Sequence, residues 1–343
     1  MTLSTPLLAA VPLVASLLGP ALSGAAPEQY ATATRVPDTP ARPDVAEHDP
    51  AQDAGVLSYW TPERMAKALP LGLPVVFAKG GLLSSLAPPV TGDDPAPPRE
   101  ATRAGVSHRS ARPLATTTGS RWAVGGAVTK TTGRVFLTLN GVDFVCSAST
   151  VRSRNRDLVV TAGHCVKDGT GAWARNWTFV PGYRKDGSQP YGRWTARRMF
   201  VAGPWARAAD DNHDIAMVAL SPSRGRHVAD VVGVQDIAFG SPRGGRTISF
   251  GYPADPPYDG RHLVYCSGAL RDDPYGGTQD QGLGCDMTAG ASGGPWLSRF
   301  DTATGKGTIT SLSSFKYSDD QRTMYGPLLG ESAKKLYELA GRA

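Results

Sequence analysis

The chain lacks three features that would each indicate a class of protein. It has no apolar run of about 20 residues, the length that a membrane-spanning helix needs, so no stable membrane anchor is expected. Its Lys and Arg residues form no dense run although the net charge is +6, so we expect no nucleic-acid partner. It has no C-x-x-C pair, which argues against a zinc ribbon, and we expect neither a metal nor another cofactor.

The composition instead suits a β-rich globular protein. Of the 343 residues, 41% are apolar, which is enough for a core and excludes wholesale disorder. The 40 glycines and 28 prolines favour turns and short strands over long helices. The length corresponds to about two units of roughly 150 residues each.

A short apolar run near the N-terminus is typical of a secretory signal. Residues 7–18 form this run, small residues follow it, and Ala21-Leu22-Ser23 fits a small-x-small cleavage site. No Lys or Arg precedes the run, and a buried hydrophobic segment is the alternative. We predict a signal peptide over residues 1–25 and therefore a secreted, extracellular protein.

The four cysteines favour disulfide bonds, because their number is even and an exported chain meets an oxidising environment. Four cysteines allow three pairings. Pairing in sequence order closes two short loops, each contributing about 3 kcal/mol in the chain-entropy model. We predict the pairs Cys146–Cys165 and Cys266–Cys285.

The composition changes near residue 112. The stretch 26–112 holds almost half of the 28 prolines and no cysteine. We predict that it is a largely disordered pro-segment, and a plain disordered linker is the alternative. One short helix is expected within it, because Thr61 can cap a helix and Pro62 suits the first helical position. Maturation is expected within residues 110–122, next to a basic and polar stretch that suits proteolytic nicking.

The sequence pattern of residues 113–343 is typical of an all-β domain. Short apolar or alternating runs are separated by Gly, Pro and Asn clusters, which are strand and turn signals. The expected strands lie at 135–139, 157–161, 215–220, 247–250 and 308–312. A C-terminal helix is predicted over residues 331–342, where apolar residues recur at helical intervals.

Three segments of this domain carry residues suited to acyl transfer. His164 lies in a small-residue turn after a buried strand, Asp214 leads a second apolar strand, and Ser292 lies among glycines. A serine hydroxyl needs an imidazole to take its proton and a carboxylate to orient that imidazole. We assign Ser292 as nucleophile, His164 as base and Asp214 as the orienting carboxylate. The amides of Gly290 and Ser292 are the candidate oxyanion donors.

Two further carboxylates compete with Asp214 for the orienting role. Asp210 and Asp211 lie only a few residues before it. Their polar surroundings indicate a solvated loop, whereas Asp214 adjoins an apolar strand that can hold it in a low dielectric. We therefore favour Asp214 and assign no role to the neighbouring His213.

The order and surroundings of these residues resemble the chymotrypsin-like (trypsin-like) serine peptidases. Thr-Ala-Gly-His-Cys ends at Cys165, Asp214 precedes Ile-Ala, and Gly-x-Ser-Gly-Gly-Pro surrounds Ser292. More narrowly, the sequence resembles the bacterial secreted branch that also holds the glutamyl endopeptidases. The resemblance implies two six-stranded antiparallel β-barrels with the site between them. It also implies a secreted serine endopeptidase that cleaves proteins or peptides through an acyl-enzyme, and a monomer is expected.

Two alternatives keep this fold and change the function. One is a catalytically silent binding protein on a peptidase scaffold, and the other is an esterase-like hydrolase with the same triad. The presence of all three triad candidates argues against the silent protein. Comparing peptide with ester substrates would separate the two enzymes.

The sequence departs from known branches of this family at three places. Ala291 stands where animal trypsins have the Asp that pairs with the new N-terminus, so that activation switch is absent. Asp286 has the offset from Ser292 of the acidic pocket base of trypsins, which would favour Arg or Lys side chains; a structural carboxylate is the alternative. No histidine follows His262, whereas glutamyl endopeptidases use a pocket histidine after the serine, so glutamyl specificity is not expected.

Overall fold

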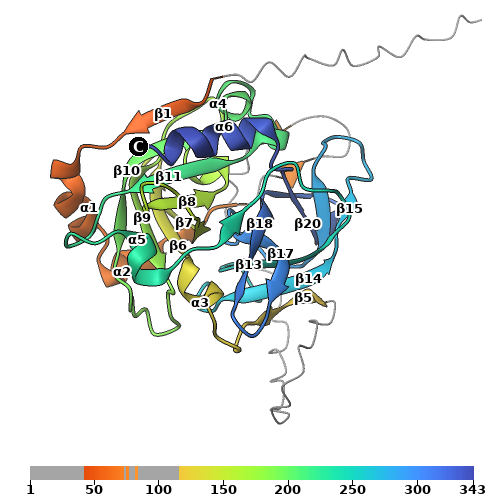
Figure 1. Cartoon of the computed structure of the whole chain (residues 1–343), viewed down its shortest axis with the longest axis horizontal. Coiled ribbons are helices and arrows are strands. Elements are labelled where there is room, and N and C mark those ends of the chain that lie inside the picture. The colour runs from red at the N-terminus through yellow and green to blue at the C-terminus, as the bar shows by residue number, and fades with distance from the viewer. Residues whose placement is uncertain (1–41, 73–74, 77–81, 84–115) are drawn as a thin grey trace, which may run out of the picture. The chain divides into compact units, whose positions relative to one another are not determined.

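The structure is a computed structural model, and it describes residues 42–72, 75–76, 82–83 and 116–343. Strands account for most of its elements, which confirms the predicted all-β class (Figure 1). The predicted signal peptide lies outside the described residues, as does the first part of the expected maturation window.

The first half of the predicted all-β domain is a closed barrel of six antiparallel strands. Their order is β10-β11-β8-β7-β6-β9, and β9 pairs back with β10. The strands are β6 (Thr132–Leu139), β7 (Val142–Thr150), β8 (Leu158–Thr161), β9 (Arg175–Pro181), β10 (Trp194–Val201) and β11 (Ala216–Leu220). Alternation along β6 sends Val135 and Leu137 into the barrel core, while Phe136 joins a separate apolar cluster on the other face.

The second half is built from two six-stranded sheets. One has the order β12-β18-β17-β13-β14-β5, and the other has the order β15-β16-β20-β19-β3-β4. The first comprises β5 (Thr116–Arg121), β12 (Asp236–Ile237), β13 (Arg246–Gly251), β14 (Val264–Ala269), β17 (Pro295–Asp301) and β18 (Lys306–Leu312). The second comprises β3 (Val75–Val76), β4 (Leu82–Leu83), β15 (Arg271–Asp272), β16 (Gln281–Gly284), β19 (Phe315–Tyr317) and β20 (Asp320–Gly326).

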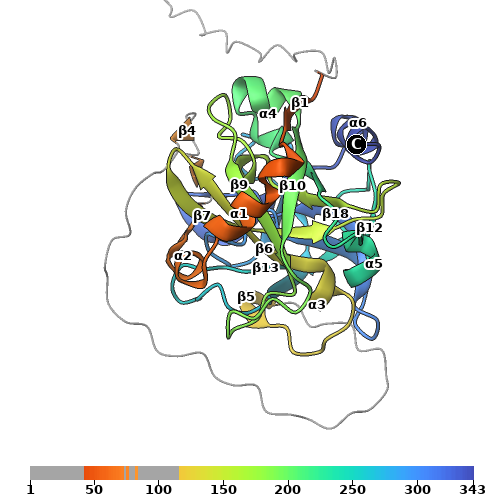
Figure 2. The same cartoon turned by 90° about the vertical axis from the view of Figure 1, so that its left-hand side faces the viewer.

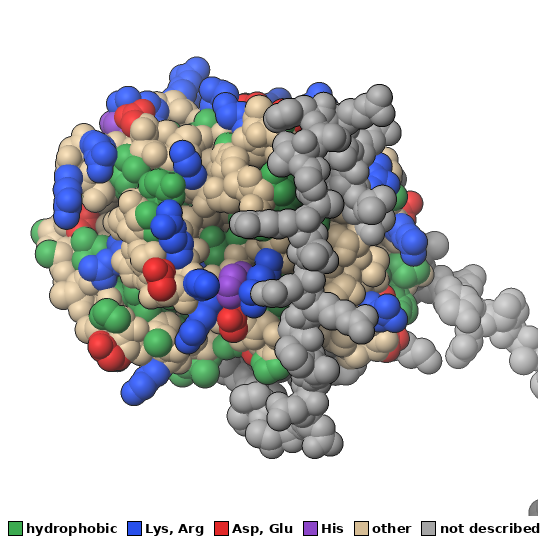
Figure 3. Space-filling view, turned by 90° about the horizontal axis from the view of Figure 1, so that it is seen from below, with side chains coloured by type: hydrophobic (Ala, Val, Ile, Leu, Met, Phe, Trp, Pro, Cys, Tyr) green, Lys and Arg blue, Asp and Glu red, His purple; other side chains and the backbone are tan. Residues whose placement is uncertain are grey.

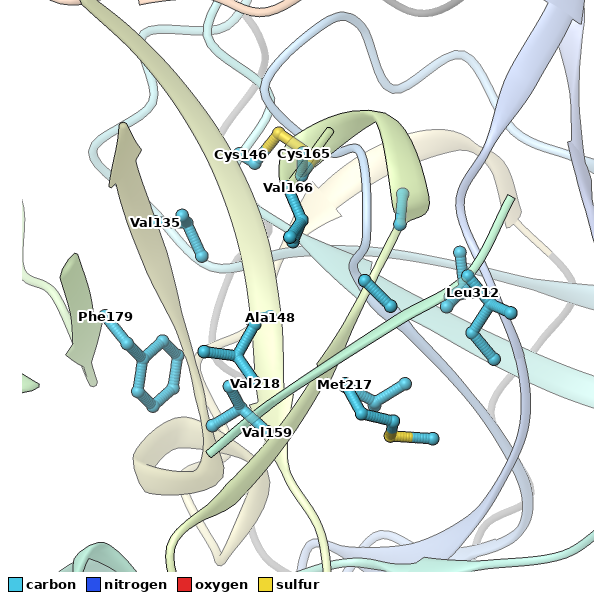
Figure 4. Close-up of a cluster of buried hydrophobic side chains, with 14 of the residues drawn as sticks. Val135, Cys146, Ala148, Val159, Cys165, Val166, Phe179, Met217, Val218 and Leu312 are labelled. Carbon is cyan, nitrogen blue, oxygen red and sulfur yellow. A yellow bond between two sulfur atoms is a disulfide. The ribbon is translucent and has the colours of Figure 1, made fainter. Parts of the chain in front are cut away.

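Both predicted disulfide bonds are present. Cys146–Cys165 joins β7 to the turn after β8, with a Cα–Cα distance of 6.2 Å. Cys266–Cys285 joins β14 to the end of β16, with a Cα–Cα distance of 5.5 Å, and so ties the two sheets of the second half together. Figure 4 shows the first disulfide beside Val166 in the core of the first barrel.

The helices are short and lie on the surface of the strands. They are α1 (Asp53–Tyr59), α2 (Pro62–Lys67), α3 (Val128–Thr131), α4 (Gly203–Ala208), α5 (Val228–Val232) and α6 (Glu331–Ala340). The predicted C-terminal helix is confirmed as α6, which buries Ala333, Leu336 and Ala340. The predicted cap of α2 is also confirmed, because the Thr61 hydroxyl accepts from the Arg64 amide at 3.2 Å. None of the described helices is long and apolar enough to cross a membrane.

Lys and Arg side chains are dispersed over the face shown in Figure 3, where polar, apolar and acidic side chains separate them. This arrangement agrees with the scattered distribution of basic residues along the chain.

The segment 42–72 is folded onto the first barrel, so the expectation of a largely disordered stretch does not describe it. Strand β1 (Asp44–Glu47) pairs antiparallel with β10, and β2 (Leu69–Pro70) pairs parallel with β7. Figure 2 shows α1 lying against the first barrel, where it contacts β9 and β10. The high proline content of this stretch suggested disorder, but three of its apolar residues pack against Phe136 and its neighbours. These residues are Val56, Trp60 and Met65.

Trp60 is the largest of these anchors. Its side chain is 1% exposed and packs beside Phe136, with ring centroids 5.5 Å apart. Its Nε1–H donates to the Asn176 carbonyl at 2.6 Å. Arg193 donates to the carbonyls of Leu57 and Trp60, both at 2.8 Å, and holds the end of α1 against the barrel.

We expect Trp60→Ala to lower the free energy of unfolding of the full chain by about 3–5 kcal/mol, because a large buried side chain leaves a cavity. Val124→Ala is the control, since Val124 is 66% exposed and its truncation should change stability by less than about 0.5 kcal/mol. Urea unfolding of both variants measures the difference. Equal midpoints would show that segment 42–72 does not contribute to the stability of the barrel.

Candidate active site

His164 is presented by a tight turn that follows β8. The strand is buried along its whole length, and a 3-10 turn over Gly163–Cys165 comes after it. Gly163 is required here, because a Cβ would lie 2.8 Å from Trp205 Cδ1 and 2.9 Å from Asp214 Oδ1. The disulfide through Cys165 fixes the turn to β7.

Asp214 lies two residues before the start of β11 and orients His164 through two contacts. Its Oδ2 is 2.7 Å from His164 Nδ1, and its Oδ1 accepts from the His164 amide at 2.8 Å. The Asp214 side chain is fully buried. Because an ionised carboxylate can only accept, this geometry places a proton on Nδ1 and leaves Nε2 free to take another. Nε2 has no hydrogen-bond partner among the described residues.

Ser314 makes a third hydrogen bond to Asp214, and no sequence pattern indicated this residue. Its hydroxyl donates to Oδ2 at 2.5 Å. Ser314 lies in a stretch rich in hydroxyl side chains just before β19, and no spacing rule distinguishes it from its neighbours. It holds the carboxylate from the second half of the domain, so the orienting group is fixed from both sides.

Ser292 lies in a loop that is packed against the first barrel. Its carbonyl accepts from the Ser147 amide at 2.8 Å. Gly293 has φ of 77°, and a Cβ there would lie 2.5 Å from the Ser147 carbonyl, so only glycine fits. This close approach brings Ser292 to the end of β8, beside the turn that carries His164. The Ser292 hydroxyl has no partner among the described residues.

The loop before Ser292 leaves two backbone amides without an acceptor among the described residues. Gly290 has φ of 90°, and its carbonyl accepts from the Ser147 hydroxyl at 2.9 Å. The Ala291 amide donates to the Thr288 carbonyl at 3.2 Å, whereas the amides of Gly290 and Ser292 donate to no residue that the structure describes. These are the two predicted oxyanion donors.

The competing carboxylates do not contact His164. Asp210 accepts from the amide and side chain of Asn212 and pairs with His213 at 3.1 Å. Asp211 is 8% exposed, so the expectation of a solvated loop is wrong for it. Burial and the nearby charges of Asp214 and Asp210 raise the pKa of Asp211 to about 7.

A second buried carboxyl group accompanies Asp211. Asp280 is 1% exposed, and neither of its carboxylate oxygens has a partner within the described part of the chain. Burial, followed by the charge of Asp211, raises the pKa of Asp280 well above its usual range. The two groups are connected through Asn212, whose side-chain oxygen accepts from the Gln279 amide at 2.5 Å.

Asp211 should make the stability of the protein depend on pH. The unfolded carboxyl has a pKa of about 3.9, so between about pH 4 and 7 the unfolded state loses this proton while the folded state keeps it. The contribution of Asp211 to the free energy of unfolding therefore falls as the pH rises through this range. We expect Asp211→Asn to be more stable than wild type at pH 8, by roughly 2–4 kcal/mol, and little changed at pH 4.

Asp210→Asn is the matched control for this prediction. Hydrogen bonds from His213 and Asn212 lower the pKa of Asp210, so its loss should destabilise the protein at pH 8. Urea unfolding at both pH values measures the two effects. Destabilisation by Asp211→Asn at pH 8 would contradict the assigned direction of the pKa shift.

Asp286 is held by two donors from the second half of the domain. The Gly119 amide donates to it at 2.7 Å and the Tyr258 hydroxyl at 2.5 Å. Lys316 is 3% exposed and donates to the carbonyls of Cys285 and Gln321. Burial lowers the pKa of Lys316 to about 8, and the charge of Asp286 opposes this shift. The hydrogen bonds of Asp286 fit the structural role that the sequence analysis kept as the alternative to a substrate pocket.

Among the described residues, one group of side chains has the mutual spacing of metal ligands: Cys146, Cys165 and His164. The two sulfur atoms are joined in a disulfide, so they offer no thiolate to a metal. These residues therefore do not fit a metal site.

Comparisons with known proteins show the family to which the chain belongs. A family model described as a trypsin-like peptidase domain matches residues 146–305. A thermostable serine protease, AL20, from an extremophilic microorganism is 39% identical; the match covers 63% of this chain and 99% of AL20, with a TM-score of 0.60. The protease Anisep from Arthrobacter nicotinovorans is also 39% identical, over 62% of this chain and 96% of Anisep, with a TM-score of 0.59.

Two further matches are less similar in sequence. A Glu endopeptidase is 17% identical over 66% of this chain and 97% of its own, with a TM-score of 0.52, and therefore shows the fold alone. An extracellular metalloprotease of Bacillus subtilis is 33% identical over 104 residues, which is 30% of this chain. The matched region is about a third of the length of that curated relative. With AL20 and Anisep matched over nearly their whole lengths, the chain belongs to the trypsin-like serine peptidases.

Proposed function

We propose that this chain is a secreted serine endopeptidase that cleaves peptide bonds with Ser292, His164 and Asp214. The observation that carries the proposal is the pair of contacts from Asp214 to the Nδ1 atom and the amide of His164. These contacts leave His164 Nε2 unpartnered, beside a serine whose hydroxyl is also unpartnered within the described chain.

In the proposed reaction, Ser292 Oγ attacks the carbonyl carbon of the substrate while His164 Nε2 takes the hydroxyl proton. Asp214 stabilises the imidazolium that forms, and the amides of Gly290 and Ser292 donate to the oxyanion. Collapse of the tetrahedral intermediate breaks the C–N bond, and the imidazolium gives its proton to the leaving amine. Water then attacks the acyl-enzyme with His164 as the base, which releases the acid and restores Ser292.

The Bacillus subtilis relative is named an extracellular metalloprotease. We derive no step through a metal here, because the candidate ligands Cys146 and Cys165 are joined in a disulfide.

We further propose that residues 1–25 are a signal peptide, that 26–112 are a pro-segment and that 113–343 form the mature, monomeric enzyme. The two disulfides support an extracellular location, since such bonds persist in oxidising compartments. Strand β5 pairs with β14, and its Gly119 donates to Asp286, so we expect the maturing cut to precede Thr116. N-terminal sequencing of secreted protein tests this position, and a start after Thr116 would contradict it.

A fluorophosphonate probe tests the proposed nucleophile. We expect the probe to label Ser292 in the wild-type chain and to leave Ser292→Ala unlabelled, as peptide mapping would show. Labelling followed by hydrolysis of esters but not of peptides would favour the esterase. Failure to label the folded wild-type chain would favour a silent binding protein and overturn the proposal.

A further inference from the structure

Strand β19 leads directly out of the proposed active site. The hydroxyl of Ser314 donates to Asp214, and the next residue begins the strand. Ser313, one position earlier, accepts from the Gly293 amide at 2.7 Å, next to Ser292. The main chain of β19 therefore starts at the catalytic centre, and one of its two sides pairs with β20.

The other side of β19 is occupied by the chain's own N-terminal part. Strand β3 pairs parallel with it, with Val75 opposite Lys316 and Val76 opposite Tyr317. Strand β4 then pairs antiparallel with β3, so the order in the sheet is β20-β19-β3-β4. A hairpin from the proposed pro-segment thus pairs with the main-chain groups on the side of β19 that faces away from β20.

A strand edge of this kind can hold only one partner. An extended peptide binds to a sheet by adding a strand, and its main-chain hydrogen bonds use the N–H and C=O groups of the edge. While β3 pairs with β19, those groups are not available to a second extended chain. Without β3, β19 is an open edge that begins beside Ser292.

The hairpin is held at this edge by the segment before it. The Leu71 amide donates to the Val145 carbonyl at 3.1 Å, four residues before Val75. Further back, the buried Trp60 fixes the segment to the first barrel. A short connection to a docked segment gives the hairpin a high effective concentration at β19, so that even a two-residue ladder can compete with substrate.

We propose that the β3–β4 hairpin occupies the β19 edge in the intact chain and competes there with an extended peptide substrate. The partner of this surface is therefore a segment of the same chain, and it must leave before peptides bind along β19. The inference rests on the proposed peptidase function and adds how access to that site is controlled.

Val76→Pro in the intact full-length chain tests the proposal. Strand β3 lies between β19 and β4, so proline removes a donor from one of its two ladders and weakens the hairpin. Val76→Thr is the matched control, because threonine keeps the backbone amide and the branched Cβ. Both are assayed as freshly purified protein whose full length is verified by mass spectrometry.

Two substrates of different size give the readout. We expect Val76→Pro to raise kcat/KM for an extended peptide amide about tenfold over Val76→Thr, the size expected for losing one or two ladder hydrogen bonds. The rate of labelling by a small fluorophosphonate should be equal in the two variants, because the probe is too short to use β19. If both variants are labelled and hydrolyse the peptide with equal kcat/KM, the proposed role of the hairpin is overturned, while the proposed peptidase function stands.

Absence of labelling in every folded variant overturns the proposed peptidase function, and with it the competition for substrate. A second measurement needs no activity. In the Ser292→Ala background, Val76→Pro should speed hydrogen exchange of the peptide that contains residues 315–317, relative to Val76→Thr. Unchanged exchange would contradict the pairing itself.

Discussion

Ser292→Ala should lower kcat for peptide hydrolysis by a factor on the order of 10⁶, by analogy with triad knockouts in other serine peptidases. The variant lacks the atom that forms the acyl-enzyme, so only binding and the oxyanion donors remain to accelerate attack by water. His164→Ala should cost a similar factor, because the serine hydroxyl then has no base. The two losses should not add, since the residues act as one unit.

Ser221→Ala is the control for this experiment. Ser221 is also a buried serine whose hydroxyl lacks a partner among the described residues, but it follows β11 at the far end from Asp214. Its variant should keep near-normal activity and near-normal thermal stability. Active-site titration and steady-state kinetics measure both variants. If Ser292→Ala kept more than a few per cent of the activity, Ser292 would not be the nucleophile.

The three triad candidates could be assigned from sequence because each lies in a short pattern with a local physical cause. His164 needs a tight turn beside a pinned cysteine, and Ser292 needs glycines that allow close backbone approach. Such constraints act within a few residues, so they leave a mark in the sequence. The two disulfides, which close loops between neighbouring strands, follow the same logic.

Contacts between residues far apart in the chain produce no comparable local sequence pattern. Ser314 reaches Asp214 across 100 positions of the chain, and its hydroxyl is one of several in the stretch before β19. Asp211 lies in a polar run but is buried, because the loop that carries Asp280 packs against it through Asn212. Burial of this kind is decided by tertiary packing, which local polarity does not encode.

The N-terminal segment shows the same limit at the level of the fold. Its prolines and low-complexity stretches indicate disorder, yet three apolar side chains anchor part of it to the first barrel. Their partners, Phe136 and Val145, belong to strands whose outward faces a sequence reading would expect to be solvated. The apolar residues on those outer faces are the signal that a second layer covers them.

Asp214→Asn should slow peptide hydrolysis by about 10⁴-fold, as it does for the corresponding carboxylate of other serine peptidases. An asparagine at this position can turn its NH₂ group toward His164 Nδ1, which then accepts and leaves the proton on Nε2. An Nε2 that already carries a proton cannot take another from Ser292. The amide of His164 donates to Oδ1, which an asparagine keeps as its carbonyl oxygen, and the Ser314 hydroxyl can turn to accept from the new NH₂ group. The side chain should therefore stay in place, and the loss should fall on kcat.

Asp211→Asn separates the role of Asp214 from a general effect of removing negative charge near the imidazole. Asp211 is buried and lies close enough to Asp214 and His164 for their charges to act on its carboxyl group. No hydrogen bond joins Asp211 to His164 within the described chain. Its variant should therefore retain kcat within about tenfold of wild type. The two variants are compared at one pH with the same peptide substrate. Near-normal activity in Asp214→Asn together with a large loss in Asp211→Asn would reverse the assignment and make Asp211 the orienting carboxylate.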